Sequence, residues 1–200
     1  DVGAGPGYFS SVFRDNLYAS IDFYPWKGLD VVCNLTDGWP IRDSSVDLIV
    51  IANVLEHMFQ PKRLISDIHK SLKEDGILAI TVPFLIKIHQ APYDYGRYTH
   101  FALRQILVEA GFENVEIEAV YDPQSLANTM LNNLYNSVPK GRNLRHRISR
   151  RFIQIALRII NSRLLSGCSY EPFGLEKDLG TDSNPFPIGY HVLCKKVKSL

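Results

Sequence analysis

The stretch Asp1-Val2-Gly3-Ala4-Gly5-Pro6-Gly7-Tyr8-Phe9-Ser10 decides the fold class, because it joins the end of a strand, a glycine-rich turn and the start of a helix. Glycine at three alternating positions lets the backbone adopt positive φ and approach a ligand where a Cβ would collide. A helix expected over 8–16 would direct free N–H groups back across the turn toward an anionic group. The stretch therefore predicts a cofactor-binding corner.

An acidic residue follows where a nucleotide-binding unit of this kind needs one. A second strand is expected over 17–23, and Asp22 near its end lies 19 residues after Gly3. A Rossmann-like unit places a carboxylate at about this spacing to accept hydrogen bonds from ribose hydroxyls. The alternative is that Asp22 has only a structural role at the end of the strand. A nicotinamide dinucleotide is disfavoured, because its G-x-G-x-x-G fingerprint would need glycine at position 8, where Tyr8 stands.

The chain beyond this corner alternates between strands and helices. Further strands are expected at 29–33, 46–52, 77–82, 114–121 and 189–196, and a helix begins at Pro61 and ends within 73–76. Such alternation predicts right-handed crossovers and a mostly parallel sheet. Ligands bind outside the carboxyl ends of such strands, so the segments after the strands should share one cleft.

Length and composition fit one globular domain. The 200 residues are 46% hydrophobic and 22% charged, which is ordinary for a chain with a sizeable core. The widely spaced Cys33, Cys168 and Cys194 argue against a disulfide framework or a zinc site, and favour a reducing, cytoplasmic setting. The uncharged run 77–86 is too short to span a bilayer. Because Asp1 already ends a strand, the chain is expected to lack residues at its N-terminus.

Charge is unevenly distributed along the sequence. Between 123 and 170 there are eight basic residues and no acidic one, although the net charge of the chain is only +1. The segment between the last two expected strands, 122–187, is far longer than a hairpin loop. It is therefore expected to be a helical, basic insertion over or beside the cleft, with 184–187 returning as an extended segment into the final strand.

One helix of this insertion, expected over 144–165, is amphipathic. It could lie in an anionic membrane interface. It could also pack its apolar face on its own sheet or on a second subunit. Nucleic-acid binding is less favoured, because Phe152 is the only aromatic ring among the arginines. The apolar face carries Leu144, Ile148, Phe152, Ile155 and Ile159, and the basic face carries Arg147, Arg150, Arg151 and Arg158.

These features occur together, in order, in one known family. The loop D-x-G-x-G-x-G resembles motif I of the class I S-adenosylmethionine (SAM) dependent methyltransferases, and residues 1–120 are similar to its type 11 methyltransferase branch. The similarity is carried by Ser45-Val46-Asp47-Leu48-Ile49, Leu55-Glu56-His57, Leu72-Lys73-Glu74-Asp75-Gly76, Thr81-Val82-Pro83-Phe84, Ala91-Pro92-Tyr93-Asp94-Tyr95-Gly96-Arg97-Tyr98-Thr99 and Ala110-Gly111-Phe112.

The resemblance implies a Rossmann-like α/β fold, with a seven-stranded, mostly parallel sheet, helices on both faces and an antiparallel last strand. Residues 1–121 and 188–200 would form this core, with the insertion between strands six and seven. It also implies that SAM is the cofactor and that the loop faces its methionine part. The residues implied to bind SAM are Asp1, Gly3, Ala4, Gly5 and Gly7 in the loop, Asp22 and Phe23 after the second strand, Asn34 and Leu35 after the third, and Asn53 after the fourth. Asn34 stands where relatives often carry an acid for the adenine amino group.

Candidate catalytic residues follow the fourth and fifth strands. The imidazole of His57 or His89 could accept the proton that a hydroxyl acceptor loses during attack. As alternatives, His57 caps a helix and His89 lies in a surface loop. Arg97 could pair with an anionic group on the acceptor, or form a structural ion pair with Asp94 or Glu56. Glu56 could brace the neighbouring loop or touch substrate. No metal site is expected.

The predicted function is transfer of a methyl group from SAM to a small-molecule, glycan or lipid-linked acceptor, with oxygen as the methylated atom. The tyrosine-rich loop 93–98 favours a saccharide, and 144–165 would allow peripheral contact with the inner membrane surface. Nucleobase methylation is disfavoured, because the tetrad after strand four is Asn53-Val54-Leu55-Glu56 rather than [DN]-P-P-[FY], and no cysteine nucleophile is near. The alternatives are a non-catalytic SAM-binding module with a partner- or membrane-binding insertion, and a nicotinamide-dependent oxidoreductase.

Overall fold

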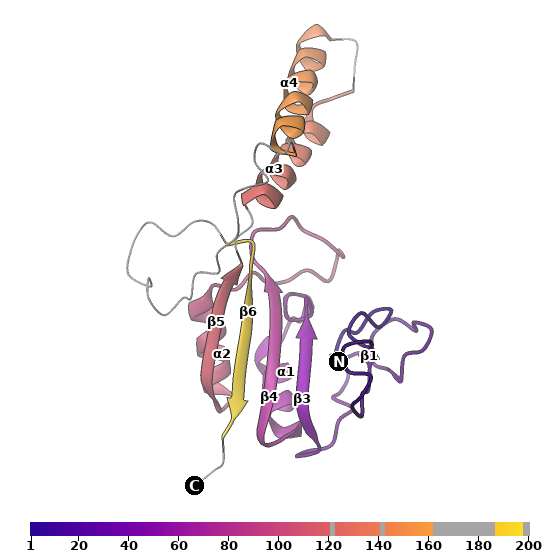
Figure 1. Cartoon of the computed structure of the whole chain (residues 1–200), viewed down its shortest axis with the longest axis vertical. Helices are drawn as coiled ribbons and strands as arrows, with labels where there is room; N and C mark the ends of the chain where they lie inside the picture. The colour runs from indigo at the N-terminus through magenta and orange to yellow at the C-terminus, as the bar shows by residue number, and fades with distance from the viewer. Residues whose placement is uncertain (121–122, 141–142, 162–186, 198–200) are drawn as a thin grey trace.

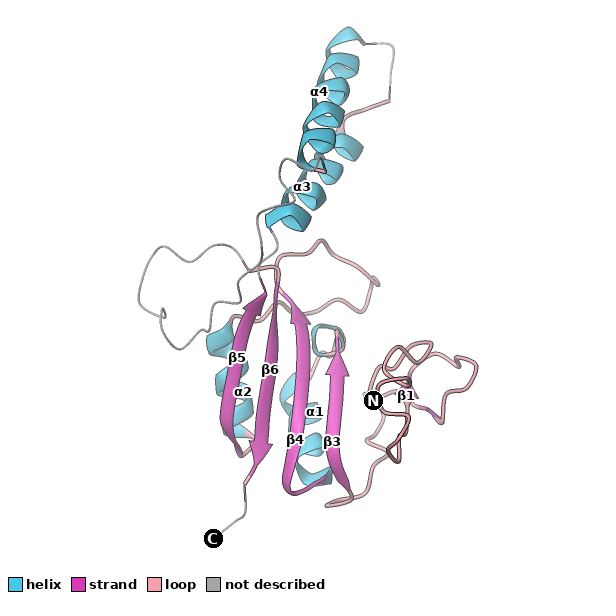
Figure 2. Ribbon diagram, viewed as in Figure 1, coloured by secondary structure: helices cyan, strands magenta, loops and turns pink. Residues whose placement is uncertain are grey.

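A mixed sheet forms the body of the protein in the computed structural model, which describes residues 1–120, 123–140, 143–161 and 187–197 (Figures 1 and 2). A four-stranded sheet has the order β3-β4-β6-β5, and β1 and β2 form a two-stranded ladder. The strands are β1 (Ile21–Asp22), β2 (Val31–Val32), β3 (Val46–Ala52), β4 (Leu72–Pro83), β5 (Phe112–Val120) and β6 (Gly189–Lys196). The helices are η1 (Leu55–His57), α1 (Pro61–Ser71), α2 (His100–Glu109), α3 (Pro123–Ser137) and α4 (Leu144–Ile160).

Val2 connects the ladder to the larger sheet. It forms parallel bridges with Ile21 of β1 and with Ile51 of β3, so the order across the described strands is β2-β1-Val2-β3-β4-β6-β5. β3 and β4 are parallel, whereas β6 lies antiparallel between β4 and β5, as expected for the last strand. The carboxyl ends of β1, β3 and β4 therefore lie along one edge of the sheet.

Sequence periodicity located the long strands better than the short ones. The strands expected at 46–52 and 189–196 coincide with β3 and β6. The described part of the chain has fewer than the seven strands expected. Where the first strand was expected, only Val2 forms strand-like bridges, because the backbone turns away at Gly3. β4 begins at Leu72 rather than at 77, because fully buried Leu72 pairs with Val46 before an irregularity in the register.

The helices that pack on the sheet, α1 and α2, both cover the same face (Figure 2). Pro61 opens α1, whose Leu64, Ile65 and Ile68 are buried in the core. The expectation of helices on both faces is wrong for the described residues, since the helix expected over 8–16 is not formed. That segment makes a series of turns, and its Tyr8 and Val12 side chains are 78% and 68% exposed. Short helices depend on tertiary packing of an apolar face, and in this segment Phe9 and Phe13 are only half-buried while Val12 is exposed.

α3 and α4 form a helical pair that stands away from the sheet, beyond the end at which β5 finishes (Figure 1). Arg150 joins the two helices: its Nη1 donates to the carbonyls of Tyr135 and Val138 at 2.9 and 2.7 Å, and its guanidinium lies 3.8 Å from the Tyr135 ring centroid. Of the expected helix 144–165, residues 162–165 lie outside the described residues, as do Cys168 and most of the expected extended return at 184–187. None of the described helices is long and apolar enough to cross a membrane.

Candidate functional site

Backbone hydrogen bonds hold the glycine-rich loop at the carboxyl edge of the sheet. Val2 N donates to the Val50 carbonyl at 2.9 Å, and the N–H groups of Gly3 and Ala4 both donate to the Ile21 carbonyl at 2.8 and 3.0 Å. Gly3, Gly5 and Gly7 all have positive φ, at 74°, 55° and 87°. The loop expected from sequence is thus present, although no helix follows it. The Asp1 carboxylate accepts a hydrogen bond from the Tyr18 hydroxyl at 2.6 Å.

Gly3 marks the closest approach between this loop and the tip of β3. A Cβ built at Gly3 would overlap Cγ2 of Val54. Asn53, which immediately precedes Val54, has a positive φ of 54° and donates its N–H to the Thr81 carbonyl at 2.8 Å. A non-glycine residue in this region is uncommon and is held there by its surroundings. The segments after two parallel strands therefore meet with no room for a side chain at Gly3.

Asp22 connects the end of β1 to the glycine-rich loop. Its Oδ2 accepts a hydrogen bond from Gly5 N at 2.8 Å, and its Oδ1 accepts one from Tyr24 N at 2.9 Å. An ionised carboxylate offers about four lone-pair positions, so each oxygen keeps one position free. The half-buried carboxylate therefore keeps acceptor positions beyond those used by the two main-chain donors.

The remaining residues expected to bind the cofactor lie around the same corner. The Phe23 ring is 51% exposed and lies 6.5 Å from the Tyr93 ring centroid, which belongs to the loop after β4. The Asn34 side-chain oxygen is occupied by a local turn, since it accepts hydrogen bonds from Thr36 N and Oγ1 at 3.1 and 2.8 Å. Leu35 lines a cavity of about 240 Å³, together with Thr36, Trp39, Met58, Phe59, Gln60, Arg63, Leu64 and Asp67.

The loop 84–99 is anchored on η1 by main-chain hydrogen bonds. The N–H groups of Tyr95 and Gly96 donate to the Glu56 carbonyl at 2.8 and 3.1 Å, and the Tyr98 hydroxyl donates to the Leu55 carbonyl at 3.2 Å. Burial raises the pKa of the Tyr98 hydroxyl, so it remains a donor at neutral pH. This anchoring brings the loop that follows β4 over the segment that follows β3.

Arg97 and Asp94 form an ion pair within this loop. Arg97 Nη1 lies 2.5 Å from Asp94 Oδ1 and Nη2 lies 2.9 Å from Oδ2, while Nη1 also donates to the Gly96 carbonyl at 2.7 Å. The hydrogen bonds from Arg97 hold the pKa of the Asp94 carboxyl well below its usual range. Of the two alternatives for Arg97, this geometry corresponds to the structural pair with Asp94. Nη1 and Nη2 are both occupied, so the guanidinium orders the loop.

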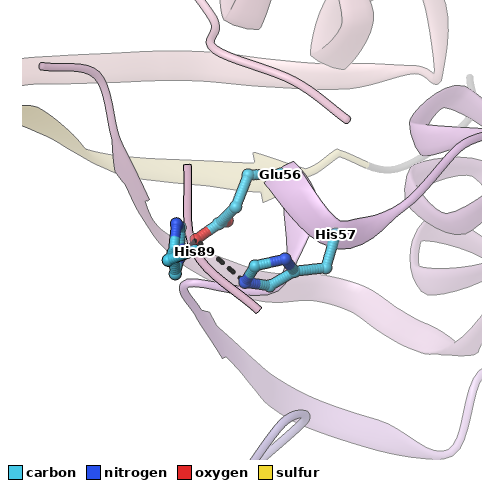
Figure 3. Close-up of side chains that lie close together, drawn as sticks. All are labelled: Glu56, His57 and His89. Atoms are coloured by element: carbon cyan, nitrogen blue, oxygen red, sulfur yellow. Dashed lines mark ion pairs between the residues drawn. The ribbon is translucent and has the colours of Figure 1, made fainter. Parts of the chain in front are cut away.

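Glu56, His57 and His89, hereafter the Glu56 cluster, meet at the end of β3 (Figure 3). The Glu56 side chain is fully buried, and among the described residues neither of its carboxylate oxygens has a hydrogen-bond partner. Its Oε1 lies 3.6 Å from His57 Nε2 and 3.8 Å from His89 Nε2. Burial raises the pKa of the Glu56 carboxyl, and the main-chain N–H of Glu56, Arg97 and, when protonated, the two imidazoles oppose this rise. The two imidazoles that the sequence placed in separate segments thus face one carboxylate.

The structure shows two contacts of the tyrosine-rich loop that sequence reasoning did not predict. Asp94 Oδ2 accepts a hydrogen bond from His89 N at 2.7 Å, and the Tyr93 carbonyl oxygen lies 2.6 Å from His57 Nδ1. The Asp94 contact could have been considered from its spacing of five residues from His89 in a polar loop. The Tyr93 contact uses the main chain, which leaves no signal in side-chain patterns.

Comparisons with known proteins found a family model, relatives and solved structures that are similar to this chain. A family model described as a methyltransferase domain matches residues 1–117, more than half of the chain. An uncharacterized methyltransferase of Mycolicibacterium gilvum is 29% identical over 94 residues, which are 40% of this chain and 37% of that protein. The chain therefore covers well under two thirds of that relative's length.

Solved structures share the fold at low sequence identity. A SAM-dependent methyltransferase from Archaeoglobus fulgidus is 18% identical, with a TM-score of 0.56 over 98% of this chain and 84% of that one. The 1,6-didemethyltoxoflavin-N1-methyltransferase of Burkholderia thailandensis, solved with its substrate and S-adenosylhomocysteine, is 15% identical, with a TM-score of 0.58 over 99% of this chain and 70% of that one. The likeness extends over nearly the whole chain.

Proposed function

Because the chain belongs to the methyltransferase domain family and its cofactor is SAM, we propose that it transfers the methyl group of SAM to a hydroxyl oxygen of a lipid-linked acceptor. The observation that carries this proposal is the position of the Glu56 cluster. The Tyr93 ring lies beside Phe23 at the cofactor corner, and the Tyr93 carbonyl contacts His57. The acceptor oxygen would therefore lie between the cofactor corner and the Glu56 cluster.

This geometry suits an acceptor that must lose a proton. SAM supplies an electrophilic methyl carbon, so the acceptor oxygen forms the new C–O bond while the C–S electron pair remains on sulfur. Gly3, Gly5 and Asp22 would hold the cofactor in one orientation. The O–H proton would leave toward the Glu56 cluster, where the His57 and His89 imidazoles are the candidate acceptors. Arg97 would contribute by keeping His89 and Asp94 in place.

The outer surface of α4 supports a membrane-bound acceptor. Leu144, Ile148, Phe152, Ile155 and Ile159 are 46–68% exposed and recur along one side of the helix. Ile153, on the opposite side of α4 by helical spacing, is 8% exposed, so the stripe is the more exposed side of the helix among the described residues. Arg147, Arg151 and Arg158 are exposed next to the stripe. An apolar stripe bordered by arginines is the pattern of a helix that lies in an anionic interface.

We expect the protein to co-float with phosphatidylcholine vesicles that contain phosphatidylglycerol. Phe152→Ser should weaken this binding about 10- to 100-fold, because a buried phenylalanine contributes roughly 1.5–3 kcal/mol. Replacing Arg147, Arg151 and Arg158 with glutamine should weaken it about 100-fold, at ~1 kcal/mol each. Leu17→Ser is the matched control, since Leu17 is fully exposed outside α4. Absence of the wild type from the floated fraction, or an equal loss in Leu17→Ser, would contradict the proposal.

Methyl transfer can be measured with methyl-labelled SAM and a polyprenyl-phosphate-linked saccharide in the same vesicles. The label should enter the lipid fraction faster than it enters the same saccharide free in solution. His57→Ala and His89→Ala should each slow turnover by about 10²- to 10⁴-fold, the usual contribution of a positioned proton acceptor, with SAM affinity retained. The control His191→Ala changes an exposed histidine on β6 and should be close to wild type. Full activity of both His57→Ala and His89→Ala would contradict the proposed role of these imidazoles as proton acceptors.

A further inference from the structure

Three lone-pair donors of the Glu56 cluster converge on one small volume. One carboxylate oxygen of Glu56, one ring nitrogen of His57 and one ring nitrogen of His89 all lie within 4.8 Å of one another. Glu56 is fully buried, and no hydrogen bond satisfies its carboxylate within the described chain. A buried carboxylate without a partner is costly unless a cation or a proton compensates it. The nearby Arg97 already makes a bidentate pair with Asp94.

Each imidazole has a polar group close to its other ring nitrogen. His57 Nδ1 lies 2.6 Å from the Tyr93 carbonyl oxygen, and His89 Nδ1 lies 3.2 Å from Asp94 Oδ2. The Tyr93 carbonyl can only accept a hydrogen bond, so His57 Nδ1 is the donor in this contact and His57 Nε2 carries the lone pair whenever that ring is neutral. Histidine ligands in metal sites are oriented in this way by a carbonyl or a carboxylate behind the ring.

The spacing between the donors suits an ion better than a hydrogen bond. Glu56 Oε1 lies 3.6 Å from His57 Nε2 and 3.8 Å from His89 Nε2, beyond hydrogen-bond distance. An ion about 2.0–2.2 Å from each donor joins donor atoms up to roughly 4.4 Å apart, which covers both distances from Glu56 Oε1. We propose that Glu56, His57 and His89 bind one divalent transition-metal ion through Oε1 and the two Nε2 atoms.

The donor set also indicates which ions fit. Two imidazoles and one carboxylate suit Zn²⁺, Fe²⁺ or Co²⁺, whereas Mg²⁺ and Ca²⁺ prefer oxygen ligands. Three protein ligands leave at least one coordination position open. The His57 and His89 side chains are 14% and 23% exposed, so the site is reached from the imidazole side rather than from the core.

The open position gives the ion a role that rests on the proposed function. An acceptor hydroxyl bound there would have a lower pKa, and its proton would pass to water at the exposed side of the imidazoles. The Nε2 atoms would then be ligands, and the ion would take over the activation of the hydroxyl. Binding of the ion itself does not require SAM or the acceptor, so it can be tested separately.

The test is a titration of chelator-dialysed full-length protein with Co²⁺, followed by calorimetry and by the visible d–d absorption of the bound ion. Wild type should bind one equivalent. His57→Ala and His89→Ala should each weaken Co²⁺ binding by at least about 100-fold. Loss of a group that only orients a ligand weakens metal binding by about 10- to 100-fold, so a larger loss indicates a ligand. His191→Ala should bind as wild type. Because His57 and His89 are partly exposed, their variants test the site even if Glu56→Gln impairs folding.

Two outcomes would overturn the proposal. One is the absence of stoichiometric Co²⁺ binding by the folded wild type, and the other is binding that persists in a His57→Ala/His89→Ala double variant. Calorimetry with SAM on the same metal-free samples keeps the conclusions apart. SAM binding without Co²⁺ binding would reject the metal site alone, whereas Co²⁺ binding without SAM binding would reject the proposed methyl transfer and leave the metal site standing.

Discussion

Gly3→Ala is expected to weaken SAM binding by at least about 100-fold, because a methyl group at this position must displace the tip of β3. The Gly3 φ of 74° disfavours any side chain, and its Cβ would overlap Cγ2 of Val54. Overpacking costs about 1–3 kcal/mol and positive φ adds about 1–3 kcal/mol. The loop and the β3 tip both border the cofactor corner. Pushing them apart should therefore raise the SAM dissociation constant, which calorimetry measures.

Gly28→Ala is the matched control for Gly3→Ala. Gly28 also has positive φ, at 88°, but a Cβ there meets nothing within 4 Å. Its alanine variant should lose some stability to urea and keep the wild-type SAM affinity. Adding Val54→Ala to Gly3→Ala removes the overlapping methyl group and should restore part of the lost affinity. Equal SAM affinities for Gly3→Ala and the wild type would contradict the close approach described above.

Asp22→Ala is expected to reduce SAM affinity by at least about 100-fold. The change removes the acceptor of Gly5 N and Tyr24 N, and an unsatisfied donor costs about 1–3 kcal/mol. It also removes the carboxylate that would accept the ribose hydroxyls, where a hydrogen bond to a charged group contributes about 1.5–3 kcal/mol. Asp22→Asn keeps one carbonyl oxygen and should lie between wild type and alanine in a calorimetric titration.

Asp30→Asn separates cofactor binding from general support of the strands. Asp30 Oδ2 also accepts hydrogen bonds, from Ser20 N at 2.8 Å and Ser20 Oγ at 2.7 Å, whereas Asp22 accepts one from Gly5 N in the glycine-rich loop. Its hydrogen bonds from Ser20 lower the pKa of the Asp30 carboxyl, so its replacement should lower stability at neutral pH. A loss of SAM affinity in Asp30→Asn as large as in Asp22→Ala would show that Asp22 acts only through strand stability.

Sequence reasoning succeeded where a segment's own pattern determines its structure. The residues of β3 and β6 were located to the residue, and Pro61 marked the start of α1, because alternation, apolar runs and proline act locally. It failed at 8–16, where Phe9, Val12 and Phe13 have helical spacing but Tyr8 and Val12 have no surface to pack on. Helical spacing alone does not supply that surface.

The candidate site shows the same division between local pattern and tertiary contact. The sequence brought His57 and His89 to one end of the sheet. It could not show that both face Glu56, because that depends on the Tyr95 and Gly96 N–H groups docking the loop on the Glu56 carbonyl. The amphipathic pattern of α4 was compatible with either packing or membrane contact. The structure buries Ile153 and leaves the apolar stripe 46–68% exposed, and membrane contact stays a prediction.

The central claim is that the corner formed by the glycine-rich loop and Asp22 binds SAM. The most direct test is calorimetric titration of the wild-type chain with SAM, S-adenosylhomocysteine and NAD under the same conditions. One equivalent of SAM or of S-adenosylhomocysteine per chain is expected, with no binding of NAD. Binding of NAD without binding of either sulfur compound would contradict the claim.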